Sequence, residues 1–344
     1  MSDFNLHING WKYFGWTRLQ VTRGIEQFAH SFMVALVDKW KDKDIPVSRG
    51  DACQVSYNND WVTSGYVTEC RDEYDADSDS ISITGRSSTG DLVDCSAVHR
   101  QFNGQGLLKI AEKLCTPFGI DVSSNTDLGA VFRIFEVEDG ETVFAAISRA
   151  AKRRGVLVLT KADGNLVFDR VGSTKVKTRL ERGVNILKGS KVDSEQDRFS
   201  VYTVKTQTQG NDNLFGSAAA SISRSAADDG VNRYRPLVIA AEDEDSGSEL
   251  QKRVNWERNI RAGRSLRVSY TVPGWEHDDG LWEPNTMVRV VDSRLRLDDD
   301  LLITEVTHLR GKNDGTTTAI TVTFPEAFDV QPLPTPKKKA GSLF

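Results

Sequence analysis

The stretch Ala319-Ile320-Thr321-Val322-Thr323-Phe324 alternates apolar with polar side chains. A period of two is typical of a β-strand with one buried and one solvated face. Similar short segments occur in the last part of the chain, at Phe199–Thr208, Leu237–Ala240, Leu266–Val272, Met287–Asp292 and Leu301–Val306. Others fill the first hundred residues, at Val21–Arg23, Ser31–Val37, Ala52–Tyr57, Gly65–Cys70 and Ser80–Thr84. Short strands at this spacing, separated by turn-forming residues, predict small barrels or sandwiches.

One pattern of a turn and three strands occurs twice in the same order. The first copy runs through Gly50-Asp51-Ala52-Cys53-Gln54-Val55, Gly65-Tyr66-Val67 and Ile81-Ser82-Ile83-Thr84. The second runs through Asn285-Thr286-Met287-Val288-Arg289-Val290, Leu302-Ile303-Thr304 and Ile320-Thr321-Val322-Thr323. The recurrence favours an internal duplication, but any two small barrels share patterns of this kind, so both interpretations stay open.

The middle of the chain has a different pattern of apolar residues. Apolar residues recur at helical spacing from Leu107 to Phe118, and again from Glu141 to Ala151, where the basic run Lys152-Arg153-Arg154 suits a helix C-terminus. Val156–Leu159 and Leu166–Phe168, joined by a turn, predict a hairpin. These elements predict an α+β unit.

The third region mixes its strands with one helix, expected from Ser248 to Ala262. Gly210–Asn232 is rich in small and polar residues and predicts a long mobile loop, with a folded helix through Ala218–Ile222 as the alternative. Pro332–Phe344 carries three prolines and three lysines and predicts an extended tail. We expect the loop and the tail to become ordered on assembly.

We therefore expect an α+β, mainly β chain, with two similar small β-barrel domains flanking or enclosing an α+β middle unit. The expected boundaries are 1–98 for the first barrel, 99–185 for the middle unit, 186–330 for the second barrel with its mobile loop at 210–232, and 331–344 for the tail. A chain of 344 residues is long enough for this division.

Composition excludes several classes of function. The formal net charge of −5 gives no overall reason to bind nucleic acid or an anionic membrane. The N-terminal residues lack the pattern of a secretory signal, and no apolar run approaches the roughly 20 residues of a spanning helix, so we expect no stable membrane insertion. The cysteines, Cys53, Cys70, Cys95 and Cys115, are widely spaced and predict buried free thiols.

The motifs of common active sites are absent from the sequence. Gly172-Ser173-Thr174-Lys175 has P-loop residues in the wrong order, and Gly85-Arg86-Ser87-Ser88-Thr89-Gly90 misses the serine hydrolase elbow by one position. The histidines His7, His30, His99, His277 and His308 occur singly, without the spacing of a metal site. We expect no catalytic, cofactor-binding or metal-binding residue, and no enzyme.

Charged runs have simple structural interpretations. Asp298-Asp299-Asp300 and His277-Asp278-Asp279-Gly280 are interpreted as solvated turns rather than calcium loops. Lys152-Arg153-Arg154 and Lys337-Lys338-Lys339 lack the interleaved aromatics of a nucleic-acid surface, so a helix end and a tail are favoured.

Several segments, in order along residues 60–330, resemble the Mu-like phage baseplate hub proteins and their late-control D relatives. The strongest runs from Gly85 through Gly90-Asp91-Leu92-Val93-Asp94-Cys95 to Ala97. The others are Gly65-Tyr66-Val67, Tyr74-Asp75-Ala76, Gly140-Glu141-Thr142, Arg235-Pro236-Leu237-Val238-Ile239, Trp256-Glu257 with Arg261, Val272-Pro273-Gly274-Trp275 and Leu281-Trp282-Glu283-Pro284-Asn285. All of these residues suit packing and turns rather than catalysis.

This resemblance implies a homotrimeric structural hub of a contractile phage tail. Such a hub acts as a symmetry adapter between a trimeric spike and a hexameric tail tube, contacts other baseplate proteins, and lets phage DNA pass through a central channel. The resemblance also implies assembly in the host bacterial cytoplasm and residence in the virion tail. It identifies no interface residue.

Three alternatives remain at the level of sequence. One is a hub that carries a cell-wall hydrolase, and another is the hub part of a type VI secretion spike. The third is a carbohydrate-binding module, which would need exposed aromatic residues such as Trp275 and Trp282.

Overall fold

The computed structural model describes residues 4–13, 17–37, 47–58, 60–74, 79–98, 100–205, 223–240, 247–311 and 315–329. The chain forms two compact units. The larger unit comprises Met1–Ala151, Val156–Lys191 and Arg267–Thr323, and the smaller unit comprises Lys152–Gly155, Val192–Leu266 and Phe324–Phe344.

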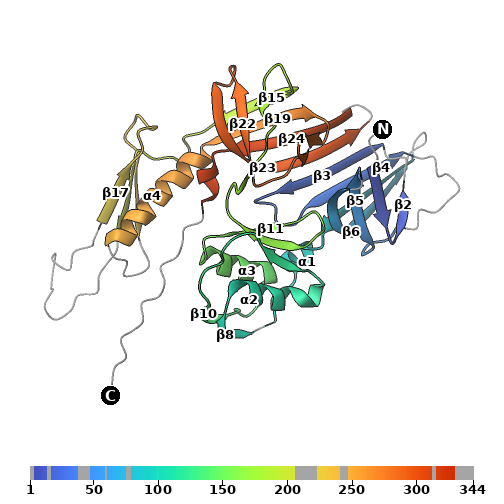
Figure 1. The fold of residues 1–344 in the computed structure, drawn as a ribbon, viewed down its shortest axis with the longest axis horizontal. Helices are drawn as coiled ribbons and strands as arrows, with labels where there is room; N and C mark the ends of the chain where they lie inside the picture. Colours follow the sequence, from blue (N-terminus) through green and yellow to red (C-terminus); the bar gives the residue numbers. More distant parts are fainter. Residues whose placement is uncertain are drawn as a thin grey trace. The chain divides into compact units, whose positions relative to one another are not determined.

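The main sheet has 14 strands and draws on both ends of the sequence (Figure 1). Along its path the strands are β15 (Lys188–Asp193), β19 (Leu266–Pro273), β24 (Gly315–Thr323), β23 (Leu297–Gly311), β3 (Arg18–Gly24), β4 (Ser31–Val37), β7 (Asp79–Ser87), β6 (Asp60–Tyr74), β5 (Ala52–Tyr57), β1 (Phe4–Ile8) and β2 (Trp11–Tyr13). β22 (Thr286–Asp292) pairs with β23, and the short β13 (Thr174–Lys175) and β14 (Leu180–Glu181) pair with β22.

The mainly β character that the sequence predicts is confirmed, but two closed barrels are not. The path has two ends, at β15 and β2, and the first and last β regions join where β3 pairs with β23. Local alternation predicts strands without naming their partners, so the junction between the two regions could not be anticipated.

The sheet contains the same frame twice. In one half β5, β6 and β7 form an antiparallel meander, and β4 and β3 follow β7. In the other half β22, β23 and β24 form the meander, and β19 and β15 follow β24. The meander strands have 6, 15 and 9 residues in the first half and 7, 15 and 9 in the second.

A bulge occupies the same place in both long strands. The register of β6 against β7 shifts around Thr68, and that of β23 against β24 shifts around Thr304. The Thr68 hydroxyl donates to the Thr84 carbonyl at 3.3 Å, and the Thr304 hydroxyl donates to the Thr321 carbonyl at 3.2 Å. Bulges re-aim a strand, so the two halves bend at equivalent points.

The turns that precede the meanders are also equivalent. Gly50 (φ 88°) donates its amide to the Val67 carbonyl at 2.8 Å, and Asn285 (φ 63°) donates its amide to the Ile303 carbonyl at 2.8 Å. Both residue types tolerate positive φ. The recurrence in the sequence therefore corresponds to equivalent strands, turns and bulges.

The α+β part of the larger unit has its own apolar core. Its helices are α1 (Gly90–Asp94), α2 (Leu107–Cys115), the 3₁₀ turn η1 (Thr116–Phe118) and α3 (Val143–Lys152). Its strands are β8 (Gln101–Gln105), β9 (Val122–Ser124), β10 (Phe132–Glu136), β11 (Leu157–Thr160) and β12 (Leu166–Asp169). The helices and the β11–β12 hairpin predicted from the sequence are confirmed. Buried residues of α2 and α3 pack with Phe102, Phe135 and Phe168 in one cluster.

A chain of buried hydroxyl groups ties this part to the main sheet. The Thr89 hydroxyl lies 2.7 Å from that of Ser87 and 2.9 Å from that of Thr160. Thr160 donates to the Phe28 carbonyl at 2.6 Å, and Ser88 donates to the Gly164 carbonyl at 2.6 Å. Buried hydroxyls are stable when each is bonded, so Ser87-Ser88-Thr89 acts as a joint between strand β7 and helix α1.

The smaller unit is a three-stranded sheet packed on one helix. Its elements are β16 (Val201–Lys205), β17 (Ser223–Ala227), β18 (Pro236–Ala240), α4 (Gly247–Arg264) and the 3₁₀ turn η3 (Pro325–Phe328). Tyr202, Val204 and Ala226 of the sheet pack against Leu250 and Val254 of α4. The predicted helix is confirmed and is slightly longer than expected.

The prediction of a mobile loop over 210–232 was wrong for its second half. Ser223–Ala227 forms a strand that pairs with β16. This strand was not predicted because its sequence is mostly small and polar, and four of its five side chains face solvent. Residues 210–222, with the alternative helix Ala218–Ile222, and the tail from Pro332 lie outside the described residues.

Candidate interaction surfaces

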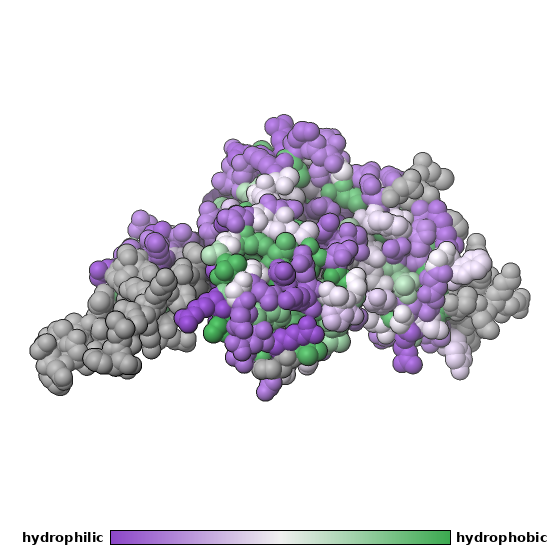
Figure 2. Space-filling model, turned by 60° about the horizontal axis from the view of Figure 1, so that its bottom comes forward, coloured by the Kyte–Doolittle hydropathy of each residue, from purple (hydrophilic) through white to green (hydrophobic). Residues whose placement is uncertain are grey.

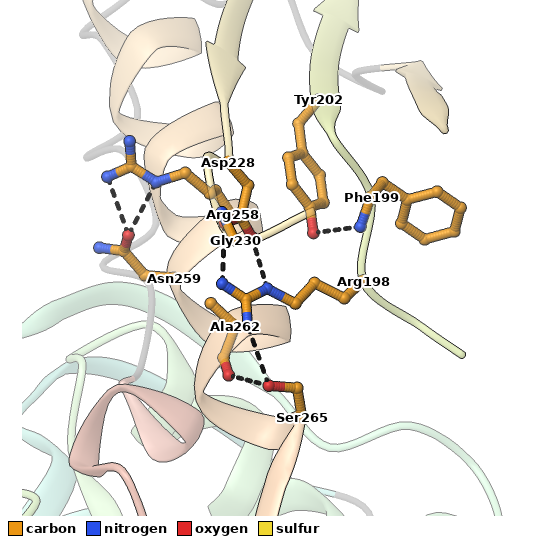
Figure 3. Close-up of polar contacts among 9 residues, drawn as sticks. All are labelled: Arg198, Phe199, Tyr202, Asp228, Gly230, Arg258, Asn259, Ala262 and Ser265. Carbon is orange, nitrogen blue, oxygen red and sulfur yellow. Dashed lines mark hydrogen bonds and ion pairs between the residues drawn. The ribbon is translucent and has the colours of Figure 1, made fainter. Parts of the chain in front are cut away.

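The smaller unit is organised by a polar network around Arg198 (Figure 3). Its guanidinium donates to both carboxylate oxygens of Asp228, at 2.7 and 2.8 Å, and to the Ser265 hydroxyl at 3.3 Å. Asp228 also accepts the Gly230 amide at 3.0 Å. The hydrogen bond from Arg198 is the largest cause of the lowered pKa of Asp228. A bidentate pair of this kind fixes geometry, so the network positions the β17–β18 turn against the end of α4.

Helix α4 carries many charges, and two of its arginines pair with a buried glutamate of the same helix. Glu257 is buried and accepts from Arg253 at 2.9 Å, with Arg261 at 3.5 Å on its other oxygen. The Arg253 guanidinium lies over the Trp256 ring, and the Trp256 indole donates to the Asp329 carbonyl at 2.8 Å. Arg253 and Arg261 are therefore engaged within the unit, whereas Lys252 and Arg264 of the same helix are exposed.

A second cluster of buried polar groups lies inside the larger unit. Arg23 is 3% exposed and donates to Glu283 at 3.1 Å. Burial, and then the charge of Arg23, holds the pKa of His30 well below its usual value and lowers that of His308 to about 3. Both imidazoles are therefore neutral, and they fill space in the core rather than transfer protons.

Trp275 and Trp282 are buried, so they cannot form the exposed aromatic surface that a carbohydrate-binding module needs. The Trp275 ring packs edge-on against Phe4 at 4.4 Å, and its indole nitrogen donates to the Leu309 carbonyl at 2.9 Å. Trp275 follows β19 and Phe4 lies in β1, so this contact links the two halves of the sheet.

The acidic run Asp298-Asp299-Asp300 was interpreted as a turn, and this was wrong. It lies in β23 opposite β22, and the turn precedes it. Asp298 pairs with Arg289 at 2.6 Å and Asp300 pairs with Lys175 at 2.7 Å. An exposed strand end that satisfies its charges in ion pairs has the composition of a turn, which explains the error.

The other sequence candidates lie apart from one another. His277-Asp278-Asp279-Gly280 is the turn between β20 (Glu276–His277) and β21 (Gly280–Leu281), as predicted. Lys152-Arg153-Arg154 ends α3. His7 lies in β1, and His99 and Lys337–Lys339 lie outside the described residues.

The cysteines are free, but only two are fully buried. Burial raises the pKa of Cys53 and of Cys115 to about 12. Cys70 is partly exposed and Cys95 is exposed, so the prediction of four buried thiols was wrong for these two.

Among the described residues, no group of three or more histidine, cysteine or acidic side chains could hold a metal ion. A shallow cavity of about 330 Å³ lies over β3, β4, β6 and β7, and Arg86 is the one ionisable residue of its described lining. Acid–base catalysis needs a second group, so this cavity does not constitute an active site. No helix in the part of the chain that the structure describes could cross a membrane.

Exposed apolar side chains are the remaining candidates for function. On the face in Figure 2, hydrophobic residues form patches among hydrophilic ones. Among the residues that the structure describes, the large exposed apolar ones are Trp11, Trp61, Tyr66, Tyr74, Val98, Val131, Ile134, Val184, Leu187, Val192, Tyr234 and Val238. Scattered patches and open strand edges are typical of a protein that assembles with others. Sequence reasoning named none of these residues as an interface, because exposure depends on the tertiary fold.

Family models and a relative in phage Mu match this chain. Residues 3–87 match the N-terminal domain of the Mu phage baseplate assembly protein GpP-like family, and residues 246–331 match the fourth domain of the GpP family. Residues 89–170 match the second domain of the gp44-like baseplate hub family. The baseplate hub protein gp44 of Escherichia phage Mu is 33% identical over 335 residues, covering 94% of this chain and 88% of its own.

Solved structures show the same fold. The 43 kDa tail protein of prophage MuSo2 from Shewanella oneidensis is 35% identical, with a TM-score of 0.85 over 95% of this chain and 99% of that one. A tail protein from Neisseria meningitidis, 23% identical, has a TM-score of 0.79 over 95% and 98% of the two chains. A type VI secretion component from E. coli, 12% identical, shares the fold at a TM-score of 0.58, over 95% of this chain and 79% of that one. The relatives in phage Mu and prophage MuSo2 are structural tail proteins, not enzymes, and this chain belongs to the family of Mu-like phage baseplate hub proteins.

Proposed function

We propose that this hub protein works as a homotrimer that adapts a trimeric spike to a hexameric tail tube. The observation that carries the proposal is the duplicated frame, in which two halves of one chain share strand order, turn and bulge. Three copies would present six similar frames, and a closed ring of six frames matches sixfold symmetry on one side while keeping threefold symmetry on the other.

The proposed ring surrounds a central channel through which phage DNA passes without stable binding. The internal pairing of the α4 arginines supports this, since a passage must not hold DNA tightly. The partners we propose are the spike protein, the tube protein and other baseplate proteins, with assembly in the host cytoplasm. In this proposal the loop 210–232, apart from its strand Ser223–Ala227, and the tail Pro332–Phe344 become protected from proteolysis on assembly, which limited proteolysis of free and assembled protein would test.

Light scattering of the purified chain, combined with electron micrographs of negatively stained particles, tests the trimer. We expect a mass three times that of the 38.2 kDa chain and rings with threefold symmetry. A mass that stays at one chain at every concentration would refute the trimer. Measured turnover of peptidoglycan by the same preparation would favour a hub with hydrolase activity instead.

A further inference from the structure

One strand pairing in the sheet lacks its counterpart in the duplicated frame. The outer part of β23, from Glu305 to Gly311, pairs with β3 of the first half. The strand equivalent to β23 is β6, since both are the 15-residue strands with a bulged threonine. The strand equivalent to β3 is β15. Along the path β3 comes after β7 and β4, and β15 comes after the equivalent strands β24 and β19. A pairing of β6 with β15 would complete the pattern.

The equivalence of β3 and β15 extends to single residues. The Thr17 amide donates to the Ala35 carbonyl at 3.0 Å, just before β3, and the Leu187 amide donates to the Thr271 carbonyl at 2.8 Å, just before β15. Ala35 and Thr271 hold equivalent places. Gly85 and Val322 lie opposite the residue before the bulge in their halves, and they pair on their other side with Phe32 and Val268. Ala35 and Thr271 lie three residues beyond Phe32 and Val268. Gly189 therefore corresponds to the second residue of β3, and the Tyr270 ring lies 2.9 Å from where a Cβ of Gly189 would stand, as this register requires.

Both strand edges are open along the described residues. β6 from Glu69 to Tyr74 has β7 on one side, and no described strand lies on the other. Its side chains there are mostly exposed, and Tyr74 is 87% exposed. β15 is the end strand of the path, with β19 as its neighbour. Open edges are templates for pairing with another chain.

The direction of the backbone groups agrees with this pairing. The Ile25 amide donates to the Thr304 carbonyl at 2.8 Å and continues the β3–β23 ladder, so every second residue of β23 from Thr304 points its peptide groups toward β3. The equivalent residues of β6 are Cys70, Asp72 and Tyr74. Their peptide groups point away from β7, toward the open side.

We propose that β15 of one copy pairs antiparallel with β6 of a second copy, with Tyr74 opposite Gly189 and Asp72 opposite Lys191. This inference rests on the proposed homotrimer and names its interface. The contact is heterologous, because two different edges meet, and such contacts build closed rings. Junctions inside one chain (β23 with β3) then alternate around the ring with junctions between chains (β6 with β15).

The side chains on the two edges carry opposite net charges. Glu69–Tyr74 carries three carboxylates and one guanidinium, a net charge of −2, whereas Lys188–Asp193 carries two ammonium groups and one carboxylate, a net charge of +1. Opposite charges on facing strands favour pairing.

Disulfide trapping tests the register. In a background with Cys70→Ser and Cys95→Ser, the variant Glu73→Cys with Ser190→Cys places thiols at a non-hydrogen-bonded pair, whose Cα atoms lie about 4.5 Å apart, within reach of a disulfide. We expect covalent species up to the trimer on oxidation, and none with either cysteine alone. Glu73→Cys with Val192→Cys is the control, because a shift of two residues, about 7 Å along the strand, prevents the bond.

A proline variant tests the backbone ladder separately. Asp72→Pro removes an amide that points to the open edge and should abolish the trimer while the circular dichroism spectrum is retained. Asp72→Ala removes the same charge, keeps the amide and should remain trimeric. A trimer that survives Asp72→Pro, or one that resists trapping, overturns this pairing but not the proposed function. A disulfide formed within one chain assigns the edge to the same copy and also overturns the pairing, whereas a strict monomer refutes the trimer itself.

Discussion

Removal of the Trp275 ring tests how firmly the two halves of the main sheet are joined. The side chain is fully buried, contacts Phe4, Tyr57 and His308 with ring centroids at 4.4, 5.4 and 4.9 Å, and donates to the Leu309 carbonyl. A buried indole removes about 200 Å² from water, which at about 25 cal/mol per Å² corresponds to about 5 kcal/mol. Alanine keeps the Cβ and loses only part of this contribution, so Trp275→Ala should lower the free energy of unfolding by about 4 kcal/mol, within the range measured for aromatic truncations.

Differential scanning calorimetry is the assay. For a unit of this size a loss of about 4 kcal/mol lowers the unfolding temperature by about 8–16 °C. Trp275→Phe keeps most of the ring but leaves the Leu309 carbonyl without its donor, so it should lose about 1–3 kcal/mol. Trp11→Ala is the matched control, because Trp11 is 72% exposed, and its transition should stay near that of the parent. Equal transitions for Trp275→Ala and Trp11→Ala would refute the view that Trp275 joins the halves.

Three further predictions concern the polar groups and the glycines. Asp228→Asn breaks the bidentate pair with Arg198 and should cost the smaller unit about 2–3 kcal/mol at pH 7. The loss should shrink in acid, because the parent loses the same interaction as the pH falls through the lowered pKa of Asp228, and calorimetry at neutral and acid pH checks this. The pKa of His308 falls to about 3 on folding, so between about pH 3 and pH 6.5 the unfolded chain binds a proton that the folded chain does not. The free energy of unfolding should therefore rise with pH by about 1.4 kcal/mol per pH unit through that window. Urea titrations of His308→Asn should show a smaller dependence on pH. Gly65→Ala places its Cβ against the Arg86 carbonyl and should give insoluble protein, whereas Gly106→Ala meets open space and should be expressed as soluble protein.

Local alternation was enough to predict many strands of the main sheet. Ser31–Val37 and Ala52–Tyr57 have the predicted bounds, because each strand has one face in the core and one outside. β23 is longer than predicted, because its first residues carry three adjacent carboxylates that look like a turn and are held by ion pairs across the sheet. β1 was missed although Phe4, Leu6 and Ile8 alternate with polar residues, whereas the polar run Lys188–Asp193 of β15 gave no clear strand signal.

The candidate surfaces could not be predicted from the sequence, for a different reason. Paired residues of β3 and β23, such as Gly24 and Glu305, are 281 or more positions apart in the sequence, and an open edge is defined by the partner that it lacks. The buried state of Trp275 and Trp282 also depends on contacts between distant segments. The absence of catalytic motifs was visible in the sequence because those motifs are local.

The two halves fill one pair of equivalent positions with different side chains. In the first half Phe32 faces Gly85 across the strands, and its ring occupies the space where a Cβ of Gly85 would lie. In the second half the equivalent pair is Val268 and Val322. A large and a small residue thus replace two of middle size at nearly constant volume, which close-packed interiors tolerate best. The two positions are therefore coupled, and a residue transplanted singly from one half to the other meets either a clash or a void.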